Sequence, residues 1–291
     1  MKYIKLKEVC MINMGQSPDS SSYNEKKEGI PFYQGNADFG EKYPITRVWC
    51  NTPIKIAQSG DILISVRAPI GALNYAKEEC CIGRGLAAIT PDKEKMSLEF
   101  VYWFLKGKNL ELNRKGTGST FKAISRKVLE EIMIPDINLK KQCEYANVLE
   151  KIHAAIQMRK QELKHLDFLL KARFVEMFGD PVANEMGWDT LPLENACKAI
   201  VDCPHSTPSY TKEDTGFRCI RTSIVKKNRI LWDEIEYIPE DEYVKRIQRK
   251  KPDVGDIVYT REGAILGIAA IIDRNCNVAL GQRSMLLSPN I

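Results

Sequence analysis

The chain has 291 residues, of which 44% are hydrophobic and 28% are charged, and its formal net charge is +5. This composition is typical of a globular protein with one large or two medium domains. No run of about 18 apolar residues occurs, which excludes a membrane-spanning helix, and the N-terminus lacks the apolar stretch of a signal peptide. We therefore expect a cytoplasmic protein without a membrane partner.

The first half of the sequence predicts a mixed α/β unit. Strands are expected at residues 32–33, at 62–66 after a Gly-Asp turn, at 86–89, and at 128–135 with a proline stop. A helix is expected over residues 97–108, because Ser97 is a suitable N-cap and Phe100, Trp103 and Phe104 share one face. A polar loop, residues 114–122, follows this helix.

A long helix is predicted next, because residues 141–178 contain neither glycine nor proline. Steps of three and four alternate along a seam that two arginines interrupt, formed by Leu149, Ile152, Ile156, Arg159, Leu163, Leu166, Leu170, Arg173 and Met177. Such a heptad repeat indicates a coiled-coil helix, which Gly179 and Pro181 would end. The alternative is a long surface helix packed on its own domain.

Two copies of one pattern lie on either side of this helix. The clearest match places the Gly60–Ser65 segment, Gly-Asp-Ile-Leu-Ile-Ser, against the Gly255–Thr260 segment, Gly-Asp-Ile-Val-Tyr-Thr. Further matches, in the same order, are Leu6–Cys10 with Leu193–Cys197, Pro31–Asn36 with Arg218–Ser223, Arg67 with Arg261, Gly71 with Gly267, and Ile82–Gly85 with Leu280–Arg283. Because the order is kept throughout, we expect the two copies to share a fold.

The two copies and the helix between them, which ends Phe-Gly-Asp-Pro at residues 178–181, resemble the specificity subunits of type I restriction–modification systems. The resemblance covers the whole chain. It implies a first target-recognition domain at 1–137, a coiled-coil spacer at 138–179 and an incomplete second recognition domain at 180–291. It further implies that each recognition domain reads one half of a split site in double-stranded DNA, and that the helices dock methyltransferase subunits and, through them, restriction subunits.

The same resemblance implies that the chain is not an enzyme. S-adenosylmethionine, ATP and magnesium are then expected only in the partner subunits, and no cofactor is expected here. The residues agree, because the sequence has no Gly-x-x-x-x-Gly-Lys-Ser/Thr phosphate loop and no Asp/Asn-Pro-Pro-Tyr/Phe tetrapeptide of an amino-methyltransferase. The three histidines, His153, His165 and His205, are widely spread.

The candidate DNA-binding residues lie on loops between the expected strands, where cations can neutralise phosphates and Arg, Asn and Gln can read base edges. In the first copy they are Gln34, Asn36, Arg67, Arg84, Lys115, Ser119, Thr120 and Lys122. In the second copy they are Arg221, Arg261, Gln282 and Arg283. The alternative for each is an ordinary solvated side chain. The candidate partner-binding residues are Leu149, Ile156, Leu163 and Leu170 on the helix.

The second copy has counterparts only up to about Lys93 of the first. We therefore expect it to be incompletely folded alone, with its last strand left as an unpaired edge. Residues 1–135 carry a net charge of +5, whereas residues 179–291 carry −2. We accordingly expect the first copy to provide the usable sequence specificity.

The nine cysteines are scattered. Cys80 and Cys81 are adjacent, which is poor spacing for two ligands of one metal, whereas Cys197, Cys203 and His205 leave a zinc site as a weaker alternative. We favour small buried thiols and expect no metal. Two other function classes stay open: an enzyme in its own right, and a coiled-coil protein-interaction adaptor without a DNA role.

Overall fold

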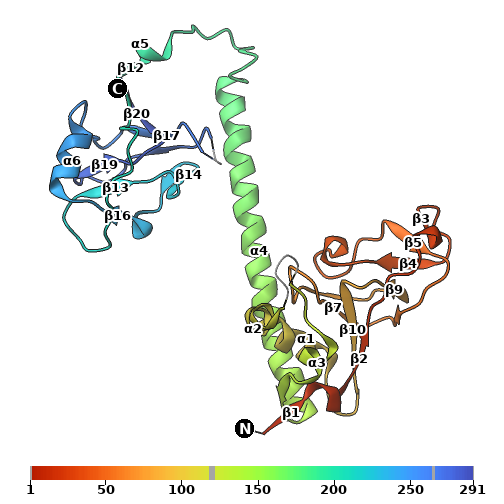
Figure 1. Ribbon diagram of the computed structural model, residues 1–291. Coiled ribbons are helices and arrows are strands. Elements are labelled where there is room, and N and C mark those ends of the chain that lie inside the picture. Colours follow the sequence, from red (N-terminus) through yellow and green to blue (C-terminus); the bar gives the residue numbers. More distant parts are fainter. Residues whose placement is uncertain (1, 118–121, 264–265, 291) are drawn as a thin grey trace. The chain divides into compact units, whose positions relative to one another are not determined.

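The computed structural model describes residues 2–117, 122–263 and 266–290. The chain forms two compact units, Met1–Arg173 and Phe174–Ile291, and the boundary between them falls within one long helix (Figure 1). Both units mix helices and strands, as the sequence predicts, and each is described by itself.

The first unit is built on a four-stranded antiparallel sheet of order β2-β10-β7-β8. Its strands are β2 (Cys10–Met14), β7 (Ile62–Ser65), β8 (Leu73–Tyr75) and β10 (Leu86–Pro91). The Gly-Asp turn sets the start of β7, because Gly60 has a φ of +89° and the Asp61 carboxylate accepts a hydrogen bond from the Gln58 N–H at 2.8 Å. Every side chain of β7 is buried. The two strands predicted here are confirmed.

A second sheet of five strands, of order β3-β5-β4-β9-β6, completes the first unit's β-structure. Its strands are β3 (Tyr23–Asn24), β4 (Ile30–Tyr33), β5 (Val48–Cys50), β6 (Ile56–Ala57) and β9 (Cys80–Ile82), and a separate pair joins β1 (Tyr3–Lys5) to β11 (Met133–Pro135). β4 and β9 run parallel, so the loops that follow them leave the sheet at the same edge.

The helices of the first unit correct two predictions. α1 (Leu98–Gly107) is confirmed, with Ser97 capping its N-terminus. The polar loop expected from residue 114 begins later, because α2 (Asn109–Lys115) buries Leu112 in the core. The strand expected over 128–135 is wrong in its first half, where α3 (Arg126–Glu130) buries Leu129 and only β11 is extended. Burial of Leu112 and Leu129 in the core stabilises these two helices, although the local sequence pattern favours a loop and a strand.

The long helix is confirmed as one element, α4 (Leu139–Phe178). Gly179, with a φ of +74°, follows its C-terminus. Its N-terminal part packs on the first unit through Gln142, which is fully buried. The Gln142 amide accepts a hydrogen bond from the Ser97 N–H at 2.8 Å and donates to the carbonyls of Lys95 and Ile137 at 2.9 and 2.7 Å. Figure 1 shows α1, α2 and α3 gathered around this part of α4.

The second unit contains a four-stranded antiparallel sheet of order β12-β20-β17-β18 and a three-stranded sheet of order β16-β13-β19. Its strands are β12 (Cys197–Asp202), β13 (Arg218–Ile220), β14 (Val225–Lys226), β15 (Arg229–Ile230), β16 (Glu236–Tyr237), β17 (Ile257–Thr260), β18 (Ala269–Ile271), β19 (Val278–Leu280) and β20 (Ser284–Pro289). Its helices are α5 (Leu193–Ala196) and α6 (Glu240–Ile247).

The two sheets repeat the arrangement of the first unit. The order β12-β20-β17-β18 corresponds to β2-β10-β7-β8, and the parallel pair of β13 and β19 corresponds to that of β4 and β9. The turn glycines agree as well, since Gly255 has a φ of +91° where Gly60 has +89°. The predicted internal repeat is therefore confirmed at the level of strand order and direction.

The expectation that the second copy's last strand is an unpaired edge is wrong. β20 lies between β12 and β17 and pairs with both. Its counterpart β10 likewise lies inside its sheet, between β2 and β7. Leu286 of β20 is buried in a core that also contains Val258, Ile272 and Val278. The strands that pair with β20 all lie within residues 197–289. The match between the two copies gave the order of segments along the chain, but not which strands are neighbours in the sheet.

Candidate nucleic-acid interface

Four of the residues predicted to bind DNA in the first unit lie around one hollow. Its volume is about 460 Å3, and its lining residues are Gln34, Gly35, Asn36, Ala37, Asp38, Arg67, Ala68, Pro69, Arg84 and Gly85. Three loops that follow or precede the buried strands β4, β7 and β10 supply this lining. Gln34 and Arg84 both line this hollow because β4 and β9 are parallel and each residue follows the same end of its strand.

The cations of this hollow are available for an anionic partner. Gln34, Arg67 and Arg84 are exposed, and no described residue forms an ion pair or hydrogen bond with the guanidinium group of either arginine; the Arg84 backbone N–H donates to the Ser17 hydroxyl at 3.2 Å. Lys122 is also exposed, and its backbone carbonyl accepts a hydrogen bond from the Ala68 N–H at 3.1 Å, which brings it next to Arg67. The loops that carry these side chains are anchored by the largely buried strands β4, β7 and β10.

Two residues that sequence reasoning missed shape this hollow. The Asp38 carboxylate accepts hydrogen bonds from the backbone N–H groups of Gln34 and Gly35, at 2.8 and 3.2 Å, and so fixes the loop after β4. The Arg47 guanidinium donates to the Ala37 carbonyl at 3.2 Å and adds a further cation beside the loop. Asp38 is the third residue of a 3-10 turn that Gly35 precedes, the position from which a carboxylate can reach back to the N-cap N–H.

The other first-unit candidates are placed less favourably. The Lys115 ammonium is paired with the Glu111 carboxylate at 2.7 Å, and Glu111 also binds Lys108 at 2.6 Å. Hydrogen bonds from these two lysines lower the pKa of Glu111 to about 2, so the carboxylate stays charged and offsets part of the lysines' charge. Ser119 and Thr120 lie outside the described residues.

In the second unit the equivalent side chains are bound to other residues of the chain. The Arg221 guanidinium pairs with the Glu236 carboxylate at 2.5 Å and lies over the Tyr210 ring at 4.7 Å. The hydrogen bond to Glu236 raises the pKa of Arg221 further. The Gln282 side chain donates to the His205 carbonyl and accepts from the Thr207 hydroxyl, both at 2.9 Å. Arg221 and Arg283 are both exposed, and Arg283 has a backbone φ of +72° and no hydrogen bond or ion pair from its side chain to a described residue.

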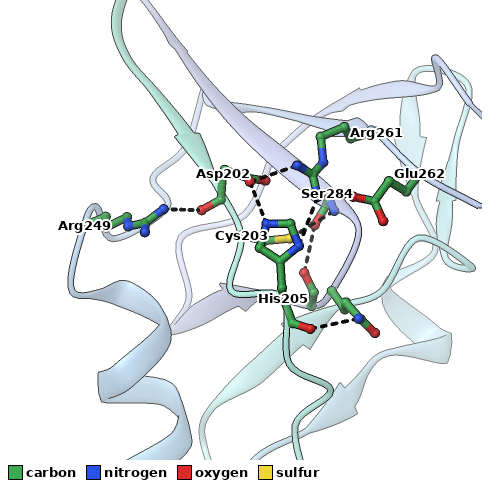
Figure 2. Close-up of polar contacts among 9 residues, drawn as sticks. Asp202, Cys203, His205, Arg249, Arg261, Glu262 and Ser284 are labelled. Atoms are coloured by element: carbon green, nitrogen blue, oxygen red, sulfur yellow. Dashed lines mark hydrogen bonds and ion pairs between the residues drawn. The ribbon is translucent and has the colours of Figure 1, made fainter.

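Arg261 is the most strongly bound of these candidates (Figure 2). Its guanidinium pairs with the Asp202 carboxylate at 2.9 Å and with the Glu262 carboxylate, and it lies 3.5 Å from the His205 Nδ1. His205 in turn contacts Asp202 at 3.0 Å through Nε2. Two carboxylates this close offset the positive charge of the Arg261 guanidinium within its own unit.

The hydrogen-bond register corrects the pairing of Arg67 with Arg261. The Arg261 N–H donates to the Arg283 carbonyl, just as the Val66 N–H donates to the Gly85 carbonyl in the first unit. Arg261 therefore occupies the position of Val66, and Glu262 occupies that of Arg67. The sequence match was one residue out of register, because it paired two arginines that stand at different distances from the strand: Arg67 is two residues after Ser65, whereas Arg261 is one residue after Thr260.

The residues predicted to bind partners lie on the exposed surface of α4. Leu149, Ile156, Leu163 and Leu170 are 41%, 48%, 64% and 67% exposed. They recur along one side of the helix at the heptad spacing predicted from the sequence. So large an apolar stripe in contact with water is typical of an interaction surface.

The cysteines are mostly buried thiols. Burial raises the pKa of Cys10 and of Cys80 to about 12 and that of Cys219 to about 11. Cys203 is 2% exposed, and its sulfur accepts a hydrogen bond from the Ser284 N–H at 3.2 Å. Within the described part of the chain, no group of His, Cys, Asp and Glu side chains is placed to hold a metal ion. No described helix is both long enough and apolar enough to cross a bilayer.

Known proteins resemble this chain in sequence and in fold. The MjaX type I restriction enzyme specificity subunit of Methanocaldococcus jannaschii is 45% identical over 156 residues, which cover 54% of this chain and 37% of that protein. The solved HsdS subunit from Thermoanaerobacter tengcongensis is 41% identical with a TM-score of 0.51, over 55% of this chain and 39% of that one. This chain thus spans about two fifths of the length of these relatives.

A third likeness concerns the fold alone. The type I restriction–modification S subunit from M. genitalium matches 100% of this chain and 72% of its own, with 15% identity and a TM-score of 0.50. The family model for the type I restriction modification DNA specificity domain matches residues 1–167, more than half of the chain and nearly all of the first unit. The chain therefore belongs to the family of type I restriction–modification DNA specificity domains.

Proposed function

We propose that this chain recognises a specific sequence in double-stranded DNA as a subunit of a type I restriction–modification complex. The observation that carries the proposal is the hollow of the first unit, where Gln34, Asn36, Arg67 and Arg84 meet. Arginine can bind two acceptors of guanine and glutamine two groups of adenine, so this set of side chains suits base reading in a major groove. Lys122 beside it suits a phosphate contact.

Each segment of the chain is proposed to have its own role. Residues 1–137 form the first recognition domain, 138–179 the spacer and 180–291 a second recognition domain, each recognition domain facing one half of a split site. The first is proposed to supply most of the specificity, because the guanidinium groups of Arg67 and Arg84 have no partner among the described residues, whereas those of Arg261 and Arg221 are bound to carboxylates. The chain itself is proposed to be non-catalytic, with methyl transfer and cleavage carried out by methyltransferase and restriction subunits.

The spacer helix is proposed to dock the methyltransferase subunits. Its apolar stripe, Leu149, Ile156, Leu163 and Leu170, is exposed on a helix that has no described break. A partner helix could cover this stripe by knobs-into-holes packing. The same stripe is also the observation that favours the second candidate function, a protein-interaction adaptor without a DNA role.

Selection from a randomised duplex library separates the two functions. The chain, assembled with its methyltransferase subunits, should enrich a defined site, and Arg67→Ala and Arg84→Ala should each relax one position of it. Lys93→Ala is the matched control, because Lys93 is exposed and follows the end of β10 remote from Arg84. An assembled complex that enriches no sequence would leave only the adaptor function.

A further inference from the structure

The second unit contains a cationic pocket away from the candidate reading residues. Its volume is about 400 Å3, and it is lined by Arg218, Trp232, Ile235, Tyr237, Arg274, Asn275 and Cys276. None of these residues is acidic, although residues 179–291 as a whole carry a net charge of −2. A locally positive pocket on an acidic unit points to an anionic ligand.

Aromatic rings hold both guanidinium groups at this pocket. Arg218 is the cross-strand neighbour of Tyr237, and its guanidinium carbon lies 5.4 Å from the centre of that ring. The Arg274 guanidinium lies 5.3 Å from the centre of the Trp232 ring. Stacking of this kind uses the flat face of the guanidinium and leaves its in-plane N–H donors for an acceptor. The Asn275 side chain lines the same pocket and offers further donors.

Among the described residues, the nearby carboxylates form at most one weak ion pair with these two cations. Asp214 approaches the Arg218 guanidinium only to 4.0 Å, and the Asp214 side chain is 61% exposed, so the pair is weak. Asp273 precedes Arg274, but its carboxylate accepts a hydrogen bond from the Trp232 indole N–H at 2.7 Å. Among the described residues no carboxylate forms an ion pair with Arg274.

The pocket is particular to the second unit. Register places Pro31 of the first unit at the position of Arg218. The segment that carries Arg274, from Ile272 to Val278, is two residues longer than its counterpart from Ala76 to Cys80. Arg218 begins β13 and Arg274 precedes β19, whereas Arg221 and Gln282 follow the opposite ends of these parallel strands. The pocket therefore lies at the other edge of this sheet from the candidate reading residues.

We propose that this pocket binds a phosphate group. Two guanidinium forks and an amide suit the several oxygens of a phosphate, and the apolar floor of Trp232 and Ile235 lowers the competition from water. The phosphate belongs either to the backbone of a nucleic acid or to a small phosphate ester, two sources with the same chemistry. The inference does not depend on the hollow of the first unit.

The test uses the full chain and two probes, inorganic phosphate and a random-sequence DNA duplex. Calorimetric titration at constant ionic strength measures phosphate binding, and titration over a range of salt measures the slope of log affinity for DNA. Arg274→Gln and Arg218→Gln each remove one charge from the pocket. Arg229→Gln removes the same charge from the exposed first residue of β15, outside the pocket, and is the matched control.

Phosphate should bind saturably to the unaltered chain and to Arg229→Gln, with at least a tenfold loss of affinity in each pocket variant. If the DNA backbone is the source, each pocket variant should also lower the salt slope by about 1, irrespective of DNA sequence. A loss of phosphate binding with an unchanged DNA slope would assign the pocket to a small phosphate ester. If neither probe distinguishes the pocket variants from Arg229→Gln, the proposal is overturned. A chain that fails to select a DNA sequence would sink the function proposed above without deciding this test.

Discussion

Asp202 and Arg261 form an ion pair, at 2.9 Å, in the two positions that Met14 and Val66 occupy in the first unit. Val66 is buried in the apolar core of the first unit, and the partly buried Met14 packs against that core. The same fold thus places an apolar pair in one copy and a charged pair in the other, at the strand ends next to the candidate reading loops. The exchange makes Arg261 part of the framework rather than a side chain available for DNA.

The two arginines should therefore respond differently to removal. Arg67→Ala should cost about 1–3 kcal/mol of specific binding and relax one position of the DNA site, because its guanidinium is available to a base. Arg261→Ala should change discrimination less than Arg67→Ala does, since that guanidinium is already bound to Asp202. Competition binding of the assembled complex at fixed salt measures both. Equal losses of discrimination in the two variants would show that the second unit reads DNA as well as the first.

Charge on the exposed stripe of α4 should prevent assembly. Leu163→Asp combined with Leu170→Asp introduces two carboxylates at positions that are 64% and 67% exposed, so the helix should survive while the apolar contact is lost. Co-purification with methyltransferase subunits should then fall to background. Gln161→Asp combined with His165→Asp adds the same charges to the opposite side of the helix and should leave assembly intact. Unchanged co-purification of the leucine variant would remove α4 from the docking surface.

Gln142 should be a stability determinant of the first unit. Gln142→Leu would remove the hydrogen bonds to the Ser97 N–H and to the carbonyls of Lys95 and Ile137, and the loss of three part-buried hydrogen bonds should cost about 2–4 kcal/mol. Gln161→Leu, on the exposed part of the same helix, should stay within about 0.5 kcal/mol of the unaltered chain. Denaturant unfolding followed by circular dichroism compares the two. A small effect of Gln142→Leu would mean that water replaces the amide.

Thiol reactivity should report the folding of each unit. At pH 8 the exposed Cys143 should be alkylated rapidly, whereas Cys80 in the first unit and Cys203 and Cys219 in the second should be protected. Burial raises the pKa of Cys219 from 9.0 to about 11, so its neutral thiol is favoured in the folded state. This contribution to stability is fully present below pH 9.0 and is lost as the pH rises through about 11. Mass spectrometry of alkylated peptides gives the rates, and rapid labelling of Cys203 and Cys219 alone would show an unfolded second unit.

Much of the architecture could be predicted from local patterns. The Gly60-Asp61 and Gly255-Asp256 turns mark the starts of equivalent strands, because only a residue tolerant of positive φ fits there. The heptad seam and the lack of glycine and proline predicted α4 to within two residues of each end. The hollow was predicted only as a set of loop residues. That four of them meet there follows from the parallel pairing of β4 and β9, which no local pattern reveals.

The remaining differences have tertiary causes. Leu129 turns the start of an expected strand into α3 by packing into the core, and the Arg126–Glu130 ion pair at 2.7 Å supports that turn of helix. The Asp202–Arg261 pair joins the last residue of β12 to the residue that follows β17, and these strands are not neighbours in their sheet, so spacing along the chain gives no sign of it. Arg67 and Arg261 were misaligned because one arginine stands two residues after its strand and the other one residue after, a difference that only the hydrogen-bond register reveals.

The central place of β20 also governs how the second unit can assemble. β12 enters its sheet only through β20, the strand furthest from it in the sequence of this unit, and β17 meets β12 only across β20. During synthesis the backbone N–H and C=O groups of β12 therefore have no strand to pair with in this sheet until Ser284–Pro289 has left the ribosome. Pairings between such distant segments close large loops and slow folding. Until β20 has emerged, the nascent second unit is therefore exposed to wrong strand pairing and to aggregation.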